Sequence, residues 1–457
     1  MDASFWKDQI DPIIRSHRWL VCVDALAGAT PMLRQWAEIG TARPLVICGT
    51  PGTGDLPEAE LAEVIVLDTG GDSIMDGFRR FHAALENPDA SLVDRIDAWD
   101  PTGDALVFSH FLDSDFRLAG RRPYGERLPE WKLLEDKMIV DDLWDASGVP
   151  RAPSAIVAAE GSALVEAAAS LDEGAGTVWV ADNKLGWHGG AEYARYVADP
   201  GDPGGAVEFF EACADRVRVM PFLEGVPCSI HPMVFPEEVI VGRPIEMLIF
   251  RRPESDRFRY AGLASGWDPP LHRRLEMQEA ARRVAVHLRE SVGYRGALSI
   301  DGVMTAEGFR PTELNARVSP GVGIQGRAAG DLPLGWINRA LLEGEELDYR
   351  PAELGELIVE AADARRTIRA LCPVPAPAAE SVDLPVAVEN GRIAVTDGEP
   401  HGRLSFGPSA QGGLVMLQVE PEHVPVGPSV APLVATAFAT ADEVWDTAIG
   451  PLIEGAR

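Results

Sequence analysis

The sequence predicts a protein of mixed α/β and α+β class, with a doubly wound domain first and α+β units after it. Its 457 residues suggest about three domains, and a hydrophobic content of 46% is enough to bury substantial cores. Strand and helix candidates alternate over the first hundred or so residues, which is the pattern of a parallel sheet with helices on both faces. Because the pattern changes near Trp131 and again after Tyr349, we expect domains at residues 1–125, 126–348 and 349–457.

The composition limits the partners that the chain can have. A formal net charge of −30 disfavours nucleic acid and anionic membranes as partners. The charge does not speak against small-molecule substrates or a homodimer. No apolar run is long enough to span a membrane, and the stretch MDASFWKDQIDPIIRSHRW lacks the basic and apolar regions of a secretory signal. The cysteines are odd in number and form no Cys-x-x-Cys pair, which indicates a reducing cytoplasm rather than a disulfide framework or a zinc site. They are Cys22, Cys48, Cys213, Cys228 and Cys372.

The N-terminal segments justify the α/β prediction one by one. Three apolar runs are predicted to be buried parallel strands, an amphipathic run is predicted to be a helix, and a last apolar run is predicted to be a further strand. These segments are, in order, residues 19–26, 44–49, 62–68, 73–85 and 104–112. The glycine-rich segment Gly49–Gly54 lacks the Gly-Lys-Ser/Thr ending of a phosphate-binding loop, so we interpret it as a turn.

The centre of the chain predicts a helix and then a glycine loop between two strands. The helix is expected from about Glu135 to a stop at Gly148, with Pro150 beyond it. Residues 177–197 then predict a strand, a loop and a second strand. A glycine loop has free backbone N–H groups and can close over phosphates. Its candidate residues are Gly186, Gly189 and Gly190.

Residues 249–270 are dense in arginine, which is informative in so acidic a chain. Guanidinium groups recognise carboxylates and phosphates, so Arg251 and Arg252 are candidates to hold a carboxylate substrate or a phosphate group. The alternative is a solvated hairpin whose charges are paired. A long amphipathic helix over residues 271–296 follows and leads into the segment with the clearest chemistry.

Residues 296–321 predict a β-hairpin. The turn begins at Thr305, and Gly308 supplies its backbone freedom. A turn centred near Gly308 places Asp301 of the first strand roughly opposite Glu313 of the second. Two carboxylates directly across a strand pair repel each other, so something must offset their charge.

A bound divalent cation is the simplest compensation for this repulsion. Asn315 and Arg317 share the face of Glu313, because side chains in a strand alternate between faces. The oxygen ligands Asp301, Glu313 and Asn315 suit Mg²⁺. Arg317 would then stabilise charge on a transferring phosphoryl group or an anionic intermediate. The alternative is a solvated hairpin whose polar face holds a salt bridge between Arg317 and Glu313.

This hairpin resembles the metal-binding hairpin of the ATP-grasp superfamily, in which an acidic residue precedes a Glu-x-Asn-x-Arg segment. Here Asp301 stands twelve residues before the Glu-Leu-Asn-Ala-Arg run that begins at Glu313. The resemblance implies that Asp301, Glu313 and Asn315 hold Mg²⁺ and that Arg317, with Asn315, acts on an acyl-phosphate or tetrahedral intermediate. It also implies ATP as a cosubstrate, a pre-ATP-grasp domain at the N-terminus, a two-subdomain ATP-grasp core and a C-terminal α+β module.

Other segments resemble the ATP-binding parts of that family in the expected order. Asp136-Lys137, at the start of the predicted helix, looks like the segment in which a lysine contacts the nucleotide phosphates. Residues 177–197 look like the glycine-rich loop. The segment that would line adenine is Met220, Pro221, Phe222 and Leu223.

One departure from the family concerns the strand before the glycine loop. The family usually ends this strand with a lysine, whereas Ala181 and Asp182 stand here. Lys184, a few residues later, is the candidate substitute from within the loop. His231, beside the strand after the adenine segment, is either structural or faces the substrate.

The resemblance implies ATP-dependent ligation of a carboxylate to an amine or thiol through an acyl-phosphate. Residues 220–232 and 258–270, with the C-terminal module, look most like ATP-grasp peptide ligases of the pheganomycin type, which join an amino acid to a peptide amine. We therefore expect an amide bond between an amino acid and an amine of an amino acid or peptide. Two alternatives stay open: an ATP-grasp kinase acting on a small molecule, and a catalytically inactive nucleotide-binding partner protein.

The C-terminal module carries strand signals but no recognisable chemistry. The Pro/Ala-rich residues 372–380 predict a linker, Asn390-Gly391 predicts a hairpin turn, and residues 431–449 predict a closing helix. Such a module would cover the active site, contribute to an acceptor pocket or form an oligomer contact.

Overall fold

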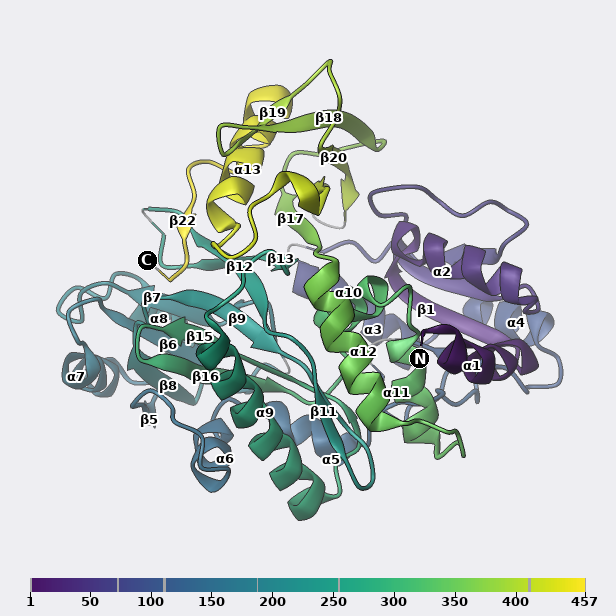
Figure 1. Cartoon of the computed structure of the whole chain (residues 1–457), viewed down its shortest axis with the longest axis horizontal. Helices are drawn as coiled ribbons and strands as arrows, with labels where there is room; N and C mark the ends of the chain where they lie inside the picture. The colour runs from purple at the N-terminus through teal and green to yellow at the C-terminus, as the bar shows by residue number, and fades with distance from the viewer. Residues whose placement is uncertain are drawn as a thin grey trace.

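The computed structural model describes residues 2–71, 74–109, 112–186, 188–253, 255–409 and 412–456 (Figure 1). Figure 1 shows the N-terminal region on the right, a small sheet on the left and the C-terminal strands at the top. Helices α9 (Leu271–Val292) and α12 (Pro351–Ala364) run across the front. Within the described ranges, every helix is too short or too polar to cross a membrane.

The N-terminal region is a parallel sheet with helices on both faces, as predicted. The strand order is β3-β2-β1-β4. Its elements are α1 (Ser4–Ser16), β1 (Trp19–Ala25), α2 (Leu26–Ile39), β2 (Leu45–Thr50), β3 (Glu63–Val66), α3 (Ile74–Glu86), α4 (Ala90–Trp99) and β4 (Leu106–Phe108). Trp19 and Val21 pack toward α1 and α2, whereas Leu20 and Cys22 pack toward α3 and α4. Positions 73, 110 and 111 of the predicted segments lie outside the described residues.

A small antiparallel sheet follows, in the order β5-β8-β6-β7, and we call it the small sheet. Its elements are β5 (Ala155–Ala158), α7 (Gly161–Leu171), β6 (Thr177–Ala181), β7 (Ala194–Val197), α8 (Ala206–Cys213) and β8 (Arg216–Pro221). Trp179 and Val219 face the two helices. The alternate residues Val180 and Met220 form a separate apolar cluster, so the sheet has a second apolar face.

A large antiparallel sheet runs from the predicted hairpin into the C-terminal module. Its order is β16-β15-β9-β12-β13-β17-β21-β20-β18-β19, with β22 beside β12. The strands are β9 (Val226–Ile230), β12 (Ile245–Arg251), β13 (Phe258–Ala264), β15 (Ser299–Thr305), β16 (Gly308–Asn315), β17 (Ile368–Val374), β18 (Val382–Glu389), β19 (Arg392–Val395), β20 (Gly402–Ser409), β21 (Gly412–Val419) and β22 (Ile453–Glu454). The predicted turn at Asn390-Gly391 joins β18 to β19.

The remaining elements pack around these sheets. They are α5 (Pro129–Lys132), the 3₁₀ turn η1 (Leu133–Glu135), α6 (Val140–Ala146), β10 (Pro232–Val234), β11 (Val239–Val241), β14 (Gly296–Ala297), α10 (Pro320–Ala328), α11 (Leu334–Glu343), the 3₁₀ turn η2 (Pro421–His423) and α13 (Ala431–Trp445). Helix α13 lies against the C-terminal strands β19 and β21, and helix α9 packs on β16 and on the short sheet β11-β10-β14. Its buried residues, such as Met277 and Val284, share one cluster with Ile300 and Leu314 of the hairpin, which holds the hairpin rigidly in the core.

Two sequence predictions about element bounds are wrong. The helix expected from Glu135 begins only at Val140, because the Asp136 carboxylate accepts the backbone N–H of Met138 at 2.9 Å and favours a turn there. The linker expected from Cys372 begins inside β17. The division into domains at 125/126 and 348/349 stays a prediction.

Candidate active site

The hairpin forms with the predicted register. Strands β15 and β16 join through a two-residue turn, and Asp301 is the register partner of Glu313. A bulge follows directly after Asp301. We call Asp301, Glu313, Asn315 and Arg317 the hairpin cluster. All four residues lie together at the end of the hairpin away from its turn.

Asp301 sits in a polar pocket that holds its carboxylate in place. Ser229 Oγ donates to one oxygen at 2.5 Å, and Asn315 Nδ2 donates to the other at 3.0 Å. Burial, and secondly the charge of Glu313, raise the pKa of Asp301 above its ordinary value. A cation between the two carboxylates would offset both effects by favouring their charged forms, so the donor set fits a divalent metal. The amide oxygen of Asn315 faces Arg317 here, so this amide would have to turn to become a third ligand.

Arg317 is held by a chain of charges that the sequence analysis missed. Its guanidinium forms an ion pair with the buried carboxylate of Glu135 and donates to Asn315 Oδ1 at 2.9 Å. Glu135 also accepts from Arg127 at 2.5 Å, and Arg127 pairs with Asp113 at 3.1 Å. Arg317 thus has an ion-pair partner outside the hairpin, Glu135, whereas the alternative offered by the sequence was a salt bridge with Glu313 on the same side of the hairpin.

Lys137 reaches the hairpin cluster from the turn before α6. Its Nζ lies 3.1 Å from Glu313 Oε1. His188, from the glycine loop, is buried beside them, and burial followed by the charge of Lys137 lowers its pKa to about 4. The turn thus meets the hairpin at Glu313, and the neutral imidazole of the loop lies near enough for the charges of Lys137 and Glu313 to act on it. His188 carries no motif signal, which is why the sequence did not single it out.

The predicted adenine segment ends β8 and enters the connection to β9. Met220, Pro221 and Phe222 are buried, whereas Leu223 is partly exposed. Met220 clusters with Val180 on the second face of the small sheet, and this apolar face suits a flat base.

The glycine loop is open as predicted, but its lysine points elsewhere. Gly186 and Gly190 have φ values of +93° and +60°, and a Cβ at either position would meet nothing within 4 Å. Gly189 lies between Gly190 and His188. Lys184 pairs with Asp215, just before β8, at 2.9 Å, and within the described residues it does not contact the hairpin cluster.

No family model matches the sequence, and no curated protein matches it. Solved structures do resemble the fold. Biotin carboxylase of Campylobacter jejuni, in complex with an ATP analogue, has a TM-score of 0.53 at 14% identity and covers 88% of this chain and 87% of its own. The biotin carboxylase domain dimer of Hydrogenobacter thermophilus 2-oxoglutarate carboxylase, with MgADP and bicarbonate, has a TM-score of 0.50 at 13% identity, covering 94% of this chain and 89% of its own.

A third structure extends the comparison. Pyruvate carboxylase of Rhizobium etli has a TM-score of 0.54 at 14% identity and covers 93% of this chain but only 37% of its own. The chain has the ATP-grasp fold. At these identities the likeness shows the fold alone, and it says nothing of the substrate.

Arg218 of β8 is a buried arginine for which the sequence analysis gave no charge partner. It lies across from Val180 of β6 in the register of the small sheet. Its guanidinium binds both oxygens of Asp141 in α6, at 2.6 and 2.8 Å, and donates to the Thr312 carbonyl of β16 at 3.2 Å. Arg218 thus joins the small sheet to α6 and to the hairpin.

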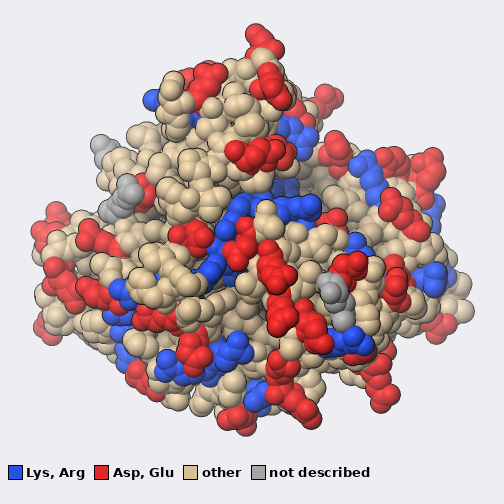
Figure 2. Space-filling model, in the orientation of Figure 1, with Lys and Arg blue, Asp and Glu red and all other residues tan. Residues whose placement is uncertain are grey.

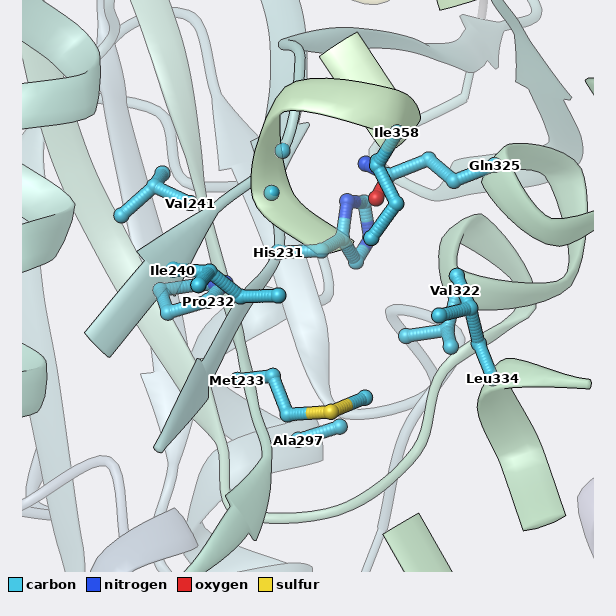
Figure 3. Close-up of a pocket in the computed structure, with 12 residues that line it drawn as sticks. His231, Pro232, Met233, Ile240, Val241, Ala297, Val322, Gln325, Leu334 and Ile358 are labelled. Atoms are coloured by element: carbon cyan, nitrogen blue, oxygen red, sulfur yellow. The ribbon is translucent and has the colours of Figure 1, made fainter. Parts of the chain in front are cut away.

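His231 lies behind the hairpin cluster rather than against a substrate. Its Nε2 is 3.2 Å from Ser229 Oγ, which donates to Asp301. Figure 3 shows the ring meeting the Gln325 side chain in a small cavity, and a Cβ on Gly321 would clash with the ring. Burial lowers the pKa of His231 to about 3, so the ring is neutral. The structure therefore favours the structural interpretation of this histidine.

The arginine-rich segment contacts other parts of the molecule. Arg251 lies over the ring of Tyr196, 3.9 Å from its centroid, and Arg252 donates to the carbonyls of Ala448 and Ile449. Within the described residues the structure brings neither arginine to the hairpin cluster. Their role in substrate binding stays a prediction.

Basic side chains nevertheless gather on one face. Figure 2 shows Lys and Arg in a hollow below the C-terminal strands, whereas acidic side chains are spread over the rest of the view. Arg243, just before β12, pairs with Asp268 and Asp363. The charge of this buried arginine, which precedes the arginine-rich segment, is therefore already paired.

A large cavity adjoins Arg317. It has a volume of about 500 Å³, within the range of small-molecule pockets. Residues from the carboxyl ends of β1 and β4 form one wall, and Ala316, Arg317 and Val318 belong to the other. Sequence reasoning did not find this cavity, because its walls come from segments far apart in the chain.

Proposed function

We propose that this chain is an ATP-dependent carboxylate–amine ligase that forms an amide bond, with an amino acid as the favoured carboxylate and an amino acid or peptide as the favoured amine. One observation carries the proposal. Two facing carboxylates, an amide and an arginine form one cluster, and a lysine from another element reaches it. The ATP-grasp fold and the resemblance to pheganomycin-type peptide ligases support the same conclusion.

The residues present fit ATP and Mg²⁺ as cofactors. Asp301, Glu313 and, after its amide turns, Asn315 would hold the metal, which neutralises phosphate charge when it is bound. Ser229 fixes the orientation of Asp301 by its hydrogen bond. Glu313 would exchange its contact with Lys137 for the metal, which frees the ammonium for a phosphate oxygen.

On the nucleotide side, the proposal uses the small sheet and the glycine loop. The apolar face around Met220 would receive the base, and Pro221, Phe222 and Leu223 would offer backbone groups at its edge. The backbone N–H groups near Gly186, Gly189 and Gly190 would contact phosphates. No charged side chain of the loop is needed for that role.

The reaction then takes two steps. A carboxylate oxygen of the substrate attacks the γ-phosphorus of ATP, the bond to ADP breaks, and an acyl-phosphate forms. The amine attacks the acyl carbon and loses a proton, and inorganic phosphate leaves. Arg317 would stabilise negative charge in both steps, and Glu135 holds the guanidinium in position for it.

An ATP-consumption assay with Mg²⁺ over a panel of amino acids and short peptides, singly and in pairs, tests the proposal. We expect ADP, phosphate and an amide product only with a particular pair. A stable phosphoester would instead identify a kinase. Nucleotide binding without consumption across a broad panel would favour an inactive partner protein.

A further inference from the structure

The cavity beside Arg317 has two chemically different walls. The first comes from the N-terminal sheet and its helices and is largely apolar. Its apolar members are Val23, Met32, Phe78, Phe81, Phe108 and Leu112. The second wall comes from the loop before β14, from the end of the hairpin and from α11, where Trp336 adds a further apolar surface. A ligand in this cavity would bury an apolar body between the two walls.

Most of the charges in the cavity neutralise one another. Glu126 pairs with Arg339 at 2.7 Å, and Arg127 pairs with Glu135. His82 contributes no charge at neutral pH, because burial lowers its pKa to about 4. These groups therefore need no ligand to balance them.

Asp24 is different, because it has no partner in the part of the chain that the structure describes. It follows the buried half of β1, on the apolar wall, and within the described residues nothing donates to its carboxylate or forms an ion pair with it. The cap position of α2 is Ala25, and no side chain caps that helix, so Asp24 is not serving as a helix cap. Partial burial disfavours the charged form of this carboxylate and so raises its pKa, and a cationic ligand beside it would offset that cost.

The second wall offers the opposite charge. Arg295 lies on it, and within the described residues its guanidinium contacts only the carbonyls of Gly293 and Tyr294. Arg317 lies on the same wall, held by Glu135. The cavity therefore has opposite charges on its two walls, with a carboxylate on the first, apolar wall and guanidinium groups on the second wall.

We propose that this cavity binds the carboxylate substrate, and that this substrate is an apolar amino acid or short apolar peptide with a free ammonium group. The ammonium faces Asp24, the apolar side chain lies between the aromatic residues, and the carboxylate faces Arg295 and Arg317. This inference rests on the proposed function, because Arg317 is the residue that links the cavity to the phosphoryl chemistry.

Two helix glycines give a direct way to fill the cavity. Gly28 of α2 and Gly335 of α11 both line it, and a Cβ at either position would meet nothing within 4 Å. Neither has a positive φ, so a side chain fits the backbone at both positions. Gly323 of α10 is a matched control, since it is exposed, lies outside the cavity and would meet only the end of the Arg327 side chain.

The test is a binding measurement by calorimetry without nucleotide, so that it does not depend on turnover. The probes are L-phenylalanine, the dipeptide L-leucyl-L-phenylalanine, 3-phenylpropionate without an ammonium, 2-phenylethylamine without a carboxylate, and L-aspartate. We expect at least one of the first two to bind, and we expect removal of either charge from it to weaken binding roughly tenfold or more. Aspartate should not bind.

The variants then locate the site. Gly28→Leu and Gly335→Leu should each weaken binding of that ligand by about tenfold or more, because an added side chain occupies its space, and Gly323→Leu should leave binding unchanged. Asp24→Asn should weaken binding of ammonium-bearing probes but not of 3-phenylpropionate. Using two cavity variants keeps the test valid if one of them does not fold.

The outcomes separate this inference from the proposed function. Binding that follows this pattern without ADP formation for any pair would support the cavity assignment and overturn the ligase proposal. ADP formation with an acid whose KM is the same in the Gly28→Leu and Gly335→Leu variants would support the ligase proposal and overturn the cavity assignment. Equal binding of the probes with and without an ammonium would overturn the role of Asp24.

Discussion

Two arginines show how differently the hairpin and the small sheet use charge. Arg317 at the end of the hairpin keeps 17% of its side chain exposed and lines the large cavity. Arg218 in the small sheet is 2% exposed, and its carboxylate contacts go to Asp141. Both arginines form an ion pair with a carboxylate, but only Arg317 also lines the large cavity.

The same contrast holds for the neighbours of the two arginines. The hairpin cluster combines facing carboxylates with an amide and with Lys137, and its oxygen ligands suit a divalent cation. The small sheet offers the apolar face around Val180 and Met220, together with open backbone at the glycine loop. We infer that the chemistry is concentrated on the hairpin and that the small sheet contributes shape and backbone groups. The following predictions test this division, in order of expected effect.

Arg218→Ala should give the largest change, and the change should be in stability. Removing one partner of a buried ion pair leaves the Asp141 carboxylate uncompensated, which costs about 3–5 kcal/mol of the free energy of unfolding. Urea denaturation measures this cost. Arg216→Ala, at an exposed position of the same strand, is the control and should change little. A stable Arg218→Ala variant with a raised KM for ATP would contradict the division and make Arg218 a phosphate ligand.

Arg317→Ala should change turnover instead of stability. Loss of a positioned cation that acts on developing charge lowers kcat by about 10²- to 10³-fold. ATP binding should stay nearly intact, and Glu135 keeps its ion pair with Arg127. Steady-state kinetics and nucleotide titration measure the two effects. Arg310→Ala, in strand β16 of the hairpin, is the control and should keep its activity. A fully active Arg317→Ala variant would contradict the proposed mechanism.

The hairpin was predictable from the sequence because its geometry is local. Period-two alternation and a short turn with Gly308 fix the register, and so they place Asp301 opposite Glu313. The α/β alternation of the N-terminal region was predictable for the same reason. Lys137 was found by resemblance rather than by pattern, since no local rule brings it to a hairpin far along the chain.

What the sequence analysis missed depends on contacts between distant segments. Glu135, Ser229 and His188 belong to no motif, and only the packed structure brings them to the hairpin cluster. The linker predicted from Cys372 is a related error. The prolines of residues 372–380 indicated a linker, although the strand β17 continues to Val374. Pro373 is tolerated in β17 because β13 pairs only with residues 368–370, so the proline needs no N–H partner on that side.

Ser229→Ala tests whether the polar shell of the hairpin serves a metal. Ser229 holds Asp301 without being one of the proposed metal ligands, and loss of such a partner typically costs about 10- to 100-fold in metal affinity. We expect the Mg²⁺ concentration for half-maximal activity to rise by that factor and saturating Mg²⁺ to restore most of the rate. A rate loss that Mg²⁺ does not reverse would mean that Ser229 acts on something other than the metal.

Lys184→Ala should give the smallest effect of these variants. The sequence offers Lys184 as the substitute for the lysine that the ATP-grasp family places before the glycine loop. In the structure it pairs with Asp215, whose side chain is 73% exposed, and surface pairs of this kind contribute little to stability. We expect the KM for ATP to rise much less in Lys184→Ala than in Lys137→Ala, and we expect the unfolding midpoint to stay the same. Equal increases in KM would show that Lys184 leaves Asp215 when ATP binds, and the small sheet would then supply a charge to the chemistry after all.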